Sequence, residues 1–387
     1  MSEWKEYKLG DLTVDGKGHY GIAAPAVDYD SSKYTYLRIT DINDDGTLNK
    51  QGLKSVDDAN AGRYLLKPND IVFARTGASV GRSYFYDGND GDLVYAGFLI
   101  KFSLDPNKVN PYMLKLYTHS QDYYDWIKAV DNGATRGNIN ALTFASMPIV
   151  LPSRYEQDKI VGVLGALDDK IDLLNRENAT LEALAETLFR HYFIENPNPA
   201  WKEGKLEDEF NFTMGQSPSG DSFNEDGIGI PMYQGNADFG FRFPTRRVYT
   251  TAPTRFAEVN DTLISVRAPV GAQNMASEKC CIGRGVAAFR HKDKSLYSYT
   301  YYKLKSLLED IRQFNDNGTV FGSISKSDFE NIDIVIPNRD GIVAFQKQAL
   351  PIDEKIRTNY KQILVLSAQR DSLLPRLMSG ETKVTGQ

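Results

Sequence analysis

Two short clusters of charged residues are the part of this sequence that is most suggestive of catalysis. Residues 168–170 read Asp-Asp-Lys and residues 353–355 read Asp-Glu-Lys. Paired carboxylates beside a lysine could hold the metal ions of a nuclease. Both clusters border a heptad pattern of apolar residues, at repeated positions of an expected helix. We therefore interpret them as the solvated flank of a coiled coil and predict no catalytic residue.

Other patterns that carry enzyme chemistry are missing from the sequence. It holds no GxxxxGK[ST] loop for nucleotide phosphates and no Asn/Asp-Pro-Pro-Tyr/Phe motif of a methyltransferase; the nearest strings, residues 110–112 and 196–199, do not fit. The four histidines are scattered and Cys280 and Cys281 are adjacent, which gives neither a metal-ligand cluster nor a disulfide framework. We predict no metal, no cofactor and, from the sparse thiols, a cytoplasmic location.

Length and charge limit the class of protein. The 387 residues, 41% of them hydrophobic, predict two or three domains with apolar cores. No apolar run approaches the ~18 residues of a membrane span, and the first residues show no signal region. Net charge is −6, but residues 242–294 hold ten Lys/Arg against four Asp/Glu, while residues 151–200 hold five against nine. A basic sector suits a phosphate backbone, although an ordinary solvated surface is the simpler explanation.

The sequence contains one long unit twice. Residues 131–152 and 316–337 share nine identities over 22 positions without a gap, at an offset of 185. Three further pairs of segments match: 4–11 with 201–208, 69–81 with 260–271, and 167–171 with 352–356. A period this long indicates a duplicated domain and not a solenoid, and it predicts a pseudo-two-fold molecule.

Each copy predicts a globular α+β domain followed by a long helix. Short apolar runs bounded by Gly, Asn, Asp and Pro indicate strands joined by turns. Residues 111–130 and 295–314 are predicted to be helices.

Beyond Pro152 the apolar residues follow a strict four–three alternation, the seam of a coiled coil. The first seam consists of Ile160, Leu164, Leu167, Ile171, Leu174, Asn178, Leu181, Ala185 and Leu188, and the second of Phe345, Ala349, Ile352, Ile356, Asn359, Ile363, Leu366, Arg370, Leu373 and Leu377. The polar breaks Asn178, Asn359 and Arg370 are expected to fix register and partner at a cost in stability. We predict that the two helices pack on each other as an antiparallel coiled coil, rather than each on its own domain, and that Pro351 kinks or delays the second helix.

The first of these helices has the most specific pattern in the chain. Residues 151–193, LPSRYEQDKIVGVLGALDDKIDLLNRENATLEALAETLFRHYF, closely resemble the central conserved region of the specificity subunits of type I restriction–modification systems. The shared pattern is a proline, Glu-Gln, an Ile-x-x-x-Leu run, Leu-Asp-x-Lys-Ile and a final Leu-Phe-x-x-x-Phe. Residues 215–240 resemble one class of that family's target-recognition domain. The resemblance covers essentially the whole chain, but the second helix lacks the Glu-Gln pair at the matching offset.

This resemblance implies a non-catalytic subunit that recognises double-stranded DNA. Each of two target-recognition domains would read one half of a bipartite asymmetric site. The helices would dock two methyltransferase subunits, which two motor-nuclease subunits join in the full complex. Helices of about 50 Å, from their ~1.5 Å rise per residue, would hold the domains about 15 base pairs apart. The expected parts are target-recognition domains at 1–152 and 196–338, a spacer helix at 153–195, a second spacer helix with a tail at 339–387, and docking residues Tyr155, Glu156 and Gln157.

Side-chain chemistry selects the candidates for DNA contact, most of them in loops punctuated by glycine. Arginine pairs with guanine, and Asn or Gln with adenine, while Arg, Ser, Thr and backbone amides hold phosphates. In the first domain the candidates are Tyr34, Arg38, Arg75, Thr76, Ser79, Arg82, Arg136, Asn138 and Asn140. In the second domain they are Gln216, Ser217, Ser219, Gln234, Asn236, Arg242, Arg267 and Arg284. A plain turn is the alternative for each of these loops.

Two other functions fit the same sequence. One is a non-DNA assembly scaffold with two ligand-binding heads on a coiled-coil rod. Salt-dependent retention on DNA that is lost when the loops of Arg75 or Arg267 are neutralised would separate a DNA reader from such a scaffold. The other keeps DNA recognition but places methylation and cleavage in one partner chain.

Overall fold

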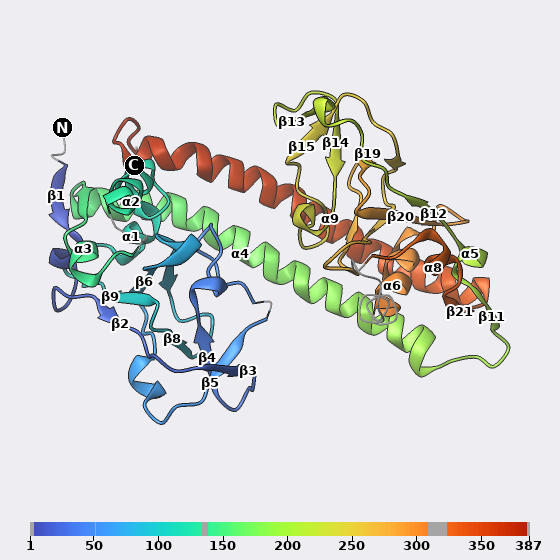
Figure 1. Cartoon of the computed structure of the whole chain (residues 1–387), viewed down its shortest axis with the longest axis horizontal. Coiled ribbons are helices and arrows are strands. Elements are labelled where there is room, and N and C mark those ends of the chain that lie inside the picture. Colours follow the sequence, from blue (N-terminus) through green and yellow to red (C-terminus); the bar gives the residue numbers. More distant parts are fainter. Residues whose placement is uncertain (1–3, 51, 134–137, 309–322, 385–387) are drawn as a thin grey trace. The chain divides into compact units, whose positions relative to one another are not determined.

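The computed structural model describes residues 4–50, 52–133, 138–308 and 323–384, and the chain divides into two compact units (Figure 1). Unit 1 comprises Met1–Leu173 together with Gln362–Gln387, and unit 2 comprises Leu174–Lys361. Each unit thus contains one part of each long helix. The predicted domain limits, which keep each helix whole, stay a prediction.

Unit 1 contains three small sheets. Its strands are β1 (Lys5–Lys8), β2 (His19–Tyr20), β3 (Ala26–Asp28), β4 (Tyr34–Leu37), β5 (Lys54–Val56), β6 (Asp70–Ala74), β7 (Ser83–Tyr86), β8 (Leu93–Tyr95), β9 (Leu99–Ser103) and β10 (Pro148–Leu151). They form the pair β1-β10 and sheets of order β2-β9-β6-β7 and β3-β5-β4-β8, in which only β4 and β8 are parallel neighbours. The helices are α1 (Pro111–Tyr117), α2 (Gln121–Gly133) and α3 (Ala141–Ala145).

The helix that the sequence predicts over residues 111–130 is therefore two helices. Thr118 donates its hydroxyl to the Lys115 carbonyl at 2.9 Å, and the Ser120 hydroxyl accepts from the Tyr123 N–H at 3.3 Å. Hydroxyl side chains that bind nearby backbone compete with the helical hydrogen bonds, and the helix breaks between α1 and α2.

Unit 2 repeats this plan. Its strands are β11 (Lys202–Lys205), β12 (Phe210–Met214), β13 (Phe223–Asn224), β14 (Ile230–Tyr233), β15 (Val248–Thr250), β16 (Phe256–Ala257), β17 (Thr262–Ser265), β18 (Gln273–Met275), β19 (Cys280–Ile282), β20 (Val286–His291) and β21 (Asp333–Ile336). The sheet orders are β11-β21, β12-β20-β17-β18 and β13-β15-β14-β19-β16. Its short helices are α5 (Leu206–Glu209), α6 (Tyr297–Ser306) and α8 (Lys326–Glu330). The helix predicted over 295–314 is present as α6, and its last predicted residues lie outside the described ranges.

The duplication extends to individual backbone conformations. Every strand of unit 1 has a counterpart at the same place in a sheet of unit 2, and β16 is an addition. Asn69 and Asn260 are the two non-glycine residues with positive φ that the described chain contains, at 74° and 71°. Asparagine tolerates this left-handed conformation better than most residues. The next residue in each unit, Asp70 or Asp261, accepts a backbone N–H three residues back, at 2.8 Å.

Aromatic rings pack against one another in both cores. In unit 1 Phe73 stacks on Phe144 with 4.9 Å between ring centroids. In unit 2 the ring of Phe193 lies between those of Tyr299 and Phe345, with 5.4 and 5.6 Å between ring centroids.

Within the described ranges, none of the helices combines the length and the apolar character needed to cross a bilayer.

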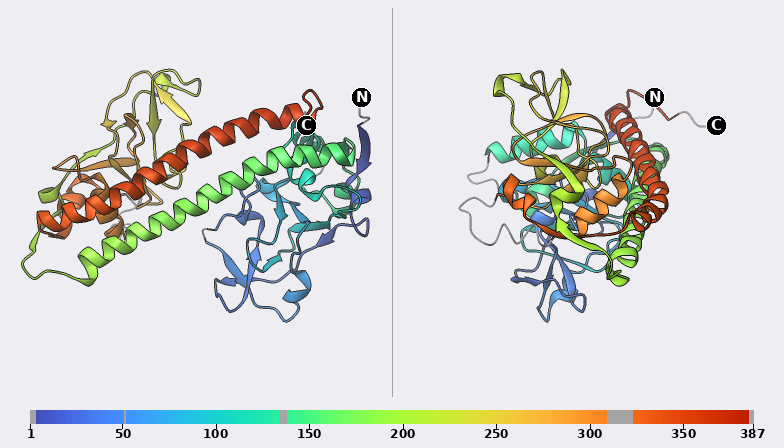
Figure 2. Two further views of the ribbon diagram at one scale, coloured as in Figure 1. Left: turned by 180° about the vertical axis from the view of Figure 1, so that it is seen from behind. Right: turned by 90° about the vertical axis from the view of Figure 1, so that its right-hand side faces the viewer.

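The two long helices are α4 (Arg154–Arg190) and α9 (Arg339–Met378), and α4 continues into a π-helical turn at His191–Glu195. Every predicted seam residue is buried or half-buried. In unit 1 Asp168 of α4 pairs with Arg370 of α9 at 3.1 Å, whereas in unit 2 Asn178 pairs with Asn359 at 2.9 Å. In unit 2 Tyr192 meets Gln348 while Asn178 meets Asn359, so the helices run antiparallel, and the left view of Figure 2 shows them side by side within each unit.

The predicted effect of Pro351 is wrong in one respect, because α9 begins at Arg339 and runs on through the proline. A proline inside a helix leaves the carbonyl four residues earlier without a partner. Pro351 and Lys347 both lie on the exposed side of α9, where water can satisfy that carbonyl.

The acid–acid–lysine clusters are structural, and the first carboxylate of each is bound by a tyrosine of its own domain. Asp168 accepts from the Tyr112 hydroxyl at 2.9 Å and lies 3.6 Å from Lys115. Asp353 accepts from the Tyr302 hydroxyl at 3.1 Å. Asp168 thus attaches α1 to α4, and Asp353 attaches α6 to α9, which corrects the prediction of a solvated flank.

Candidate nucleic-acid interface

In unit 1 the turn that joins β8 to β9 gathers three other backbone segments around it. The Arg75 N–H donates to the Phe98 carbonyl at 3.1 Å, and the Ala96 N–H donates to the Leu37 carbonyl at 3.0 Å. Gly21 approaches the turn so closely that a Cβ there would lie 2.2 Å from the Ala96 oxygen. We call this arrangement the turn frame; it brings the residues that follow β2, β4 and β6 to one place.

Several predicted residues of unit 1 meet on this frame. Arg75 donates from Nε and Nη2 to Asn138 Oδ1, at 3.2 and 3.1 Å, and its guanidinium carbon lies 4.9 Å from the ring centroid of Tyr20. Thr76 forms a backbone bridge with Asn138. Phe98 stands beside them with 60% of its surface exposed. The group offers an arginine, an amide and two exposed aromatic rings, a combination that suits nucleic acid.

Three of the remaining unit 1 candidates already have partners within the protein. Arg38, which follows Leu37 on the frame, holds Asp41 through Nε and Nη2 at 2.8 and 2.6 Å. Arg82 pairs with Asp44 at 2.7 Å, and Asn140 caps α3 by accepting from the Thr143 N–H at 2.9 Å. Of the other three, Tyr34 is partly exposed, Ser79 is almost buried, and Arg136 lies outside the described residues.

Unit 2 builds the same frame around the turn between β19 and β20. The Val266 N–H donates to the Gly285 carbonyl at 2.9 Å, and the Gly283 N–H donates to the Tyr233 carbonyl at 2.8 Å. A Cβ on Gly215 would lie 2.1 Å from the Gly283 oxygen. These contacts match those of Arg75, Ala96 and Gly21 one for one.

Most of the predicted unit 2 residues lie on this second frame. The Arg284 N–H donates to Ser217 Oγ at 3.3 Å, and a Cβ on Gly283 would lie 3.5 Å from Cγ of Gln234. Gln216 joins them through its N–H, which donates to the carbonyl of Ile282 at 3.0 Å. Arg267, exposed, follows Val266, and Asn236 follows two residues after Gln234. Ser219 lies in the next turn, where its carbonyl accepts from Ser222.

The prediction of Arg242 as a DNA contact is wrong, because only 2% of its surface is exposed. Its guanidinium is held by Asp353 inside unit 2. Arg242 therefore contributes to the packing of unit 2 and not to its surface.

The arginines on the frame of unit 2 differ from the other arginines of the basic sector, residues 242–294, in having no acidic partner among the described residues. Elsewhere in that sector arginines are neutralised, as Arg246 is by Glu278 at 2.5 Å and Arg290 is by Asp261 at 2.5 Å. Arg267, Arg284 and Arg255 are exposed and have no acidic partner among the residues that the structure describes. Arg255, which sequence reasoning missed, belongs to the same face because its carbonyl accepts from the Ile282 N–H at 2.9 Å.

The two frames share a backbone but carry different side chains. The equivalent pairs, in the order unit 1 then unit 2, are Arg38 and Gln234, Arg75 and Val266, Thr76 and Arg267, Gly97 and Arg284, and Asn138 and Ser323. At each pair the hydrogen-bonding groups differ in kind or number. Two such faces would select different base sequences.

A hollow of about 320 Å³ lies beside the start of α4, near two of the predicted docking residues. It is lined by Trp4, Tyr155, Glu156, Ile160 and Leu377, among others. Tyr155 exposes 68% of its surface. An exposed aromatic ring at the edge of an apolar hollow is typical of a protein-binding site.

The third predicted docking residue, Gln157, has an internal role instead. It is buried; Oε1 accepts from the Asn110 N–H at the start of α1, and Nε2 donates to the Pro152 carbonyl, both at 3.0 Å. In unit 2 Gln346 accepts from the Tyr299 N–H at 3.0 Å in the same way. The second helix therefore has its glutamine, four residues beyond the position that the constant offset of 185 gives.

Comparison with known proteins identifies the family of the chain. The domain family described as "Type I restriction modification DNA specificity domain" matches residues 1–183 and 198–358. The putative type I restriction enzyme MjaX specificity subunit of Methanocaldococcus jannaschii is 27% identical over 376 residues, which cover 92% of this chain and 88% of that protein. The type I restriction enzyme HindI specificity subunit of Haemophilus influenzae is 23% identical, over 98% of this chain and all of that protein.

Solved structures include proteins of the same fold. The S subunit of a type I restriction–modification system from M. genitalium has a TM-score of 0.58 and 18% identity, over 97% of this chain and 96% of that one. The duplicated α+β units, the paired helices and the family match agree, and the chain belongs to the family of type I restriction–modification DNA specificity subunits.

Proposed function

We propose that each unit of this DNA-recognition subunit reads one half of a bipartite, asymmetric site through its turn frame. The observation that carries the proposal is the pair of frames with one backbone and different side chains. A fixed backbone presents side chains at constant positions, so that the sequence read depends on which side chains are present. Two frames that differ at five equivalent positions would give an asymmetric site.

The exposed arginines suit both parts of DNA recognition. Arginine binds guanine through two hydrogen bonds in the major groove, and it also holds phosphates. Arg267 and Arg284 lie on the frame of unit 2, and Arg75 lies on that of unit 1 with its guanidinium partly occupied by Asn138. A scaffold that does not bind DNA would not require exposed arginines that lack an acidic partner among the described residues, as Arg267 and Arg284 do, and the family match also favours the reader.

We further propose that the chain is non-catalytic and that methyltransferase subunits, joined by restriction subunits, dock on the helices. The hollow beside Tyr155 is the place in unit 1 that fits such a contact, since it combines apolar lining with an exposed ring. Two copies of each partner would match the duplication of the chain. Whether methylation and cleavage reside in separate partner chains is decided by the sequences of those partners.

Salt-dependent binding tests the proposed reader. The chain with its methyltransferase partner is titrated onto duplex DNA, first as wild type and then as Arg267→Ala and Arg284→Ala. Each lost phosphate contact lowers the slope of log affinity against log salt by about 0.9. Arg246→Ala is the matched control, because Arg246 is already paired with Glu278. Binding of the wild type that does not depend on salt, or no binding with the partner present, would favour the scaffold.

A further inference from the structure

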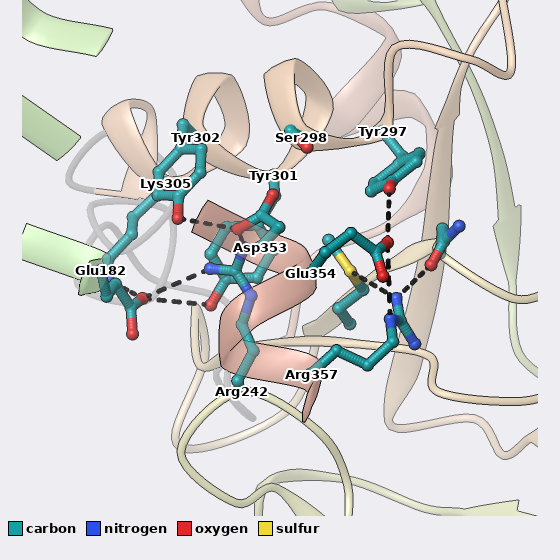
Figure 3. Close-up of polar contacts among 12 residues, drawn as sticks. Glu182, Arg242, Tyr297, Ser298, Tyr301, Tyr302, Lys305, Asp353, Glu354 and Arg357 are labelled. Carbon is teal, nitrogen blue, oxygen red and sulfur yellow. Dashed lines mark hydrogen bonds and ion pairs between the residues drawn. The ribbon is translucent and has the colours of Figure 1, made fainter. Parts of the chain in front are cut away.

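The buried Arg242 joins the second domain to both long helices within unit 2 (Figure 3). Its Nη2 donates to Oδ1 of Asp353 on α9, and its Nη1 lies 3.6 Å from Oε1 of Glu182 on α4. Burial alone would lower the pKa of Arg242, but Asp353 and Glu182, with Tyr301 and Tyr302 nearby, reverse this and raise it. The guanidinium is therefore a permanent cation between two helices.

Two tyrosines of α6 close the site around the guanidinium. The guanidinium carbon lies 3.4 Å from the ring centroid of Tyr301 and 5.1 Å from that of Tyr302. Lys305 supplies a second cation, 2.6 Å from Glu182. A buried guanidinium that stacks on a ring and pairs with carboxylates is held in a single orientation, because its planar fork must match both. Arg242 therefore fixes the position of its own loop relative to α4, α6 and α9.

That segment also carries part of the turn frame. The Gln234 N–H donates to Oδ2 of Asp238 at 2.7 Å, and the Thr245 N–H donates to the Asp238 carbonyl at 2.8 Å. Between them, Gly240 exchanges two hydrogen bonds with the side chain of Asn274, at 3.1 and 2.8 Å. One braced loop thus runs from Gln234 on the candidate DNA face to Arg242 on the helices.

Unit 1 provides the same cation in a different way. Asp168, the counterpart of Asp353 at the offset of 185, pairs with Arg370 of α9 at 3.1 Å and lies 3.6 Å from Lys115 of α1, so its guanidinium comes from a long helix and not from a loop of the domain. The residue of α4 at the position of Arg370 is Ala185, which is buried and carries no charge. In unit 2 the helices therefore depend on the domain for the cation that Asp353 needs.

We infer that Arg242 is a positioning residue that fixes the orientation of the unit 2 face on the helices of its own unit and thereby sets the accuracy of the gap between the two half-sites. The inference rests on the proposed function. One base pair corresponds to about 3.4 Å along the duplex, so a face that can tilt on its helices would accept neighbouring gap lengths. The half-site sequences would stay the same, because Arg242 itself offers no group to the frame and Asp238 and Asn274 still hold the loop that carries Gln234.

The test measures methylation by the complete modification complex on duplexes that carry both half-sites at the natural gap, or at a gap one base pair shorter or longer. Arg242→Met keeps an unbranched apolar stem of four atoms and removes the guanidinium with its charge. The preference of this variant for the natural gap should fall about tenfold relative to wild type, which corresponds to roughly 1.4 kcal/mol of orientational selectivity. Arg242→Lys should fall between the two, because lysine keeps the charge but not the planar fork.

Two controls separate positioning from a loss of folding. Arg246→Met removes a surface arginine of the same loop, 58% exposed and paired with Glu278, and should leave the gap preference unchanged. Arg242→Met combined with Glu182→Gln and Asp353→Asn leaves no unpaired buried carboxylate, and it should fold while keeping the relaxed gap.

Three outcomes decide the matter. A relaxed gap with unchanged half-site sequences supports the inference. An equal loss of methylation at all gap lengths, in both the single and the triple variant, overturns it and leaves Arg242 a stabilising residue only. Failure of the wild-type complex to prefer any sequence or gap would instead refute the proposed function.

Discussion

Replacing Asp353 with asparagine should destabilise unit 2 by about 3 kcal/mol, because it leaves the Arg242 cation buried without its main counter-charge. Side-chain exposure is 2% for Arg242 and 4% for Asp353, so water cannot take over the lost interaction. Complete loss of a buried partner costs about 3–5 kcal/mol. We expect the lower value, since the asparagine oxygen can still accept from Tyr302 and Arg242.

The equivalent change in unit 1, Asp168→Asn, is the matched comparison. Asp168 is 14% exposed, and its partner Arg370 is 30% exposed. A pair this open to solvent is worth about 1 kcal/mol. The two substitutions are identical in chemistry and differ in burial and in the element that carries the cation.

The chain offers a separate fluorescent reporter for each unit. Of its three tryptophans, Trp4 and Trp126 belong to unit 1 and Trp201 belongs to unit 2. Urea unfolding followed in a Trp4→Phe/Trp126→Phe background reports on unit 2, and a Trp201→Phe background reports on unit 1. Two results would refute the reasoning that Arg242 and Asp353 form a desolvated ion pair. One is an equal loss of unfolding free energy for Asp353→Asn and Asp168→Asn, and the other is a loss below about 1 kcal/mol for Asp353→Asn.

Two further predictions concern buried polar groups of unit 2. Burial raises the pKa of Glu209 to about 6 from 4.5, against the opposing effects of Lys303 and Tyr299. Because the folded state then holds the proton more tightly, the unfolding free energy should fall as pH rises from about 4.5 through 6, by roughly 2 kcal/mol, and Glu209→Gln should lack this loss in urea titrations across that range. At the seam, Asn359→Leu should lower the unfolding free energy by about 1–3 kcal/mol, because it leaves the buried amide of Asn178 without a partner. The double variant Asn178→Leu/Asn359→Leu should recover that stability in the same urea titrations. A double variant less stable than the single one would contradict a pairing role.

The features predicted correctly from sequence are those that repeat. Heptad spacing located the seam from Ile160 to Leu188, and its polar break Asn178 does meet Asn359 across the helices. The constant offset revealed the duplicated α+β unit. Such patterns are visible because many residues obey one period.

The errors concern single residues whose partners lie far away in the sequence. Arg242 resembles any loop arginine until Asp353, 111 residues later, is seen to bury it. Gln157 and Gln346 do not align at the offset of 185, and only the shared contact with a helix start relates them. Tyr20, Phe98 and Arg255 were missed because no local motif marks them. A search for exposed aromatic or basic residues next to the turn that the two units share would have required the sheet order first.

The central claim is that each unit reads one half of a bipartite site, and methylome sequencing tests it most directly. A host carrying the wild-type chain and its partners is compared with one whose chain has the unit 2 frame altered by Gln234→Ala and Arg284→Ala. We predict that the wild-type host shows one two-part methylated motif, and that the variant relaxes or loses specificity in a single half while the other half and the gap stay the same. A change in both halves, or a motif without two parts, would contradict the account.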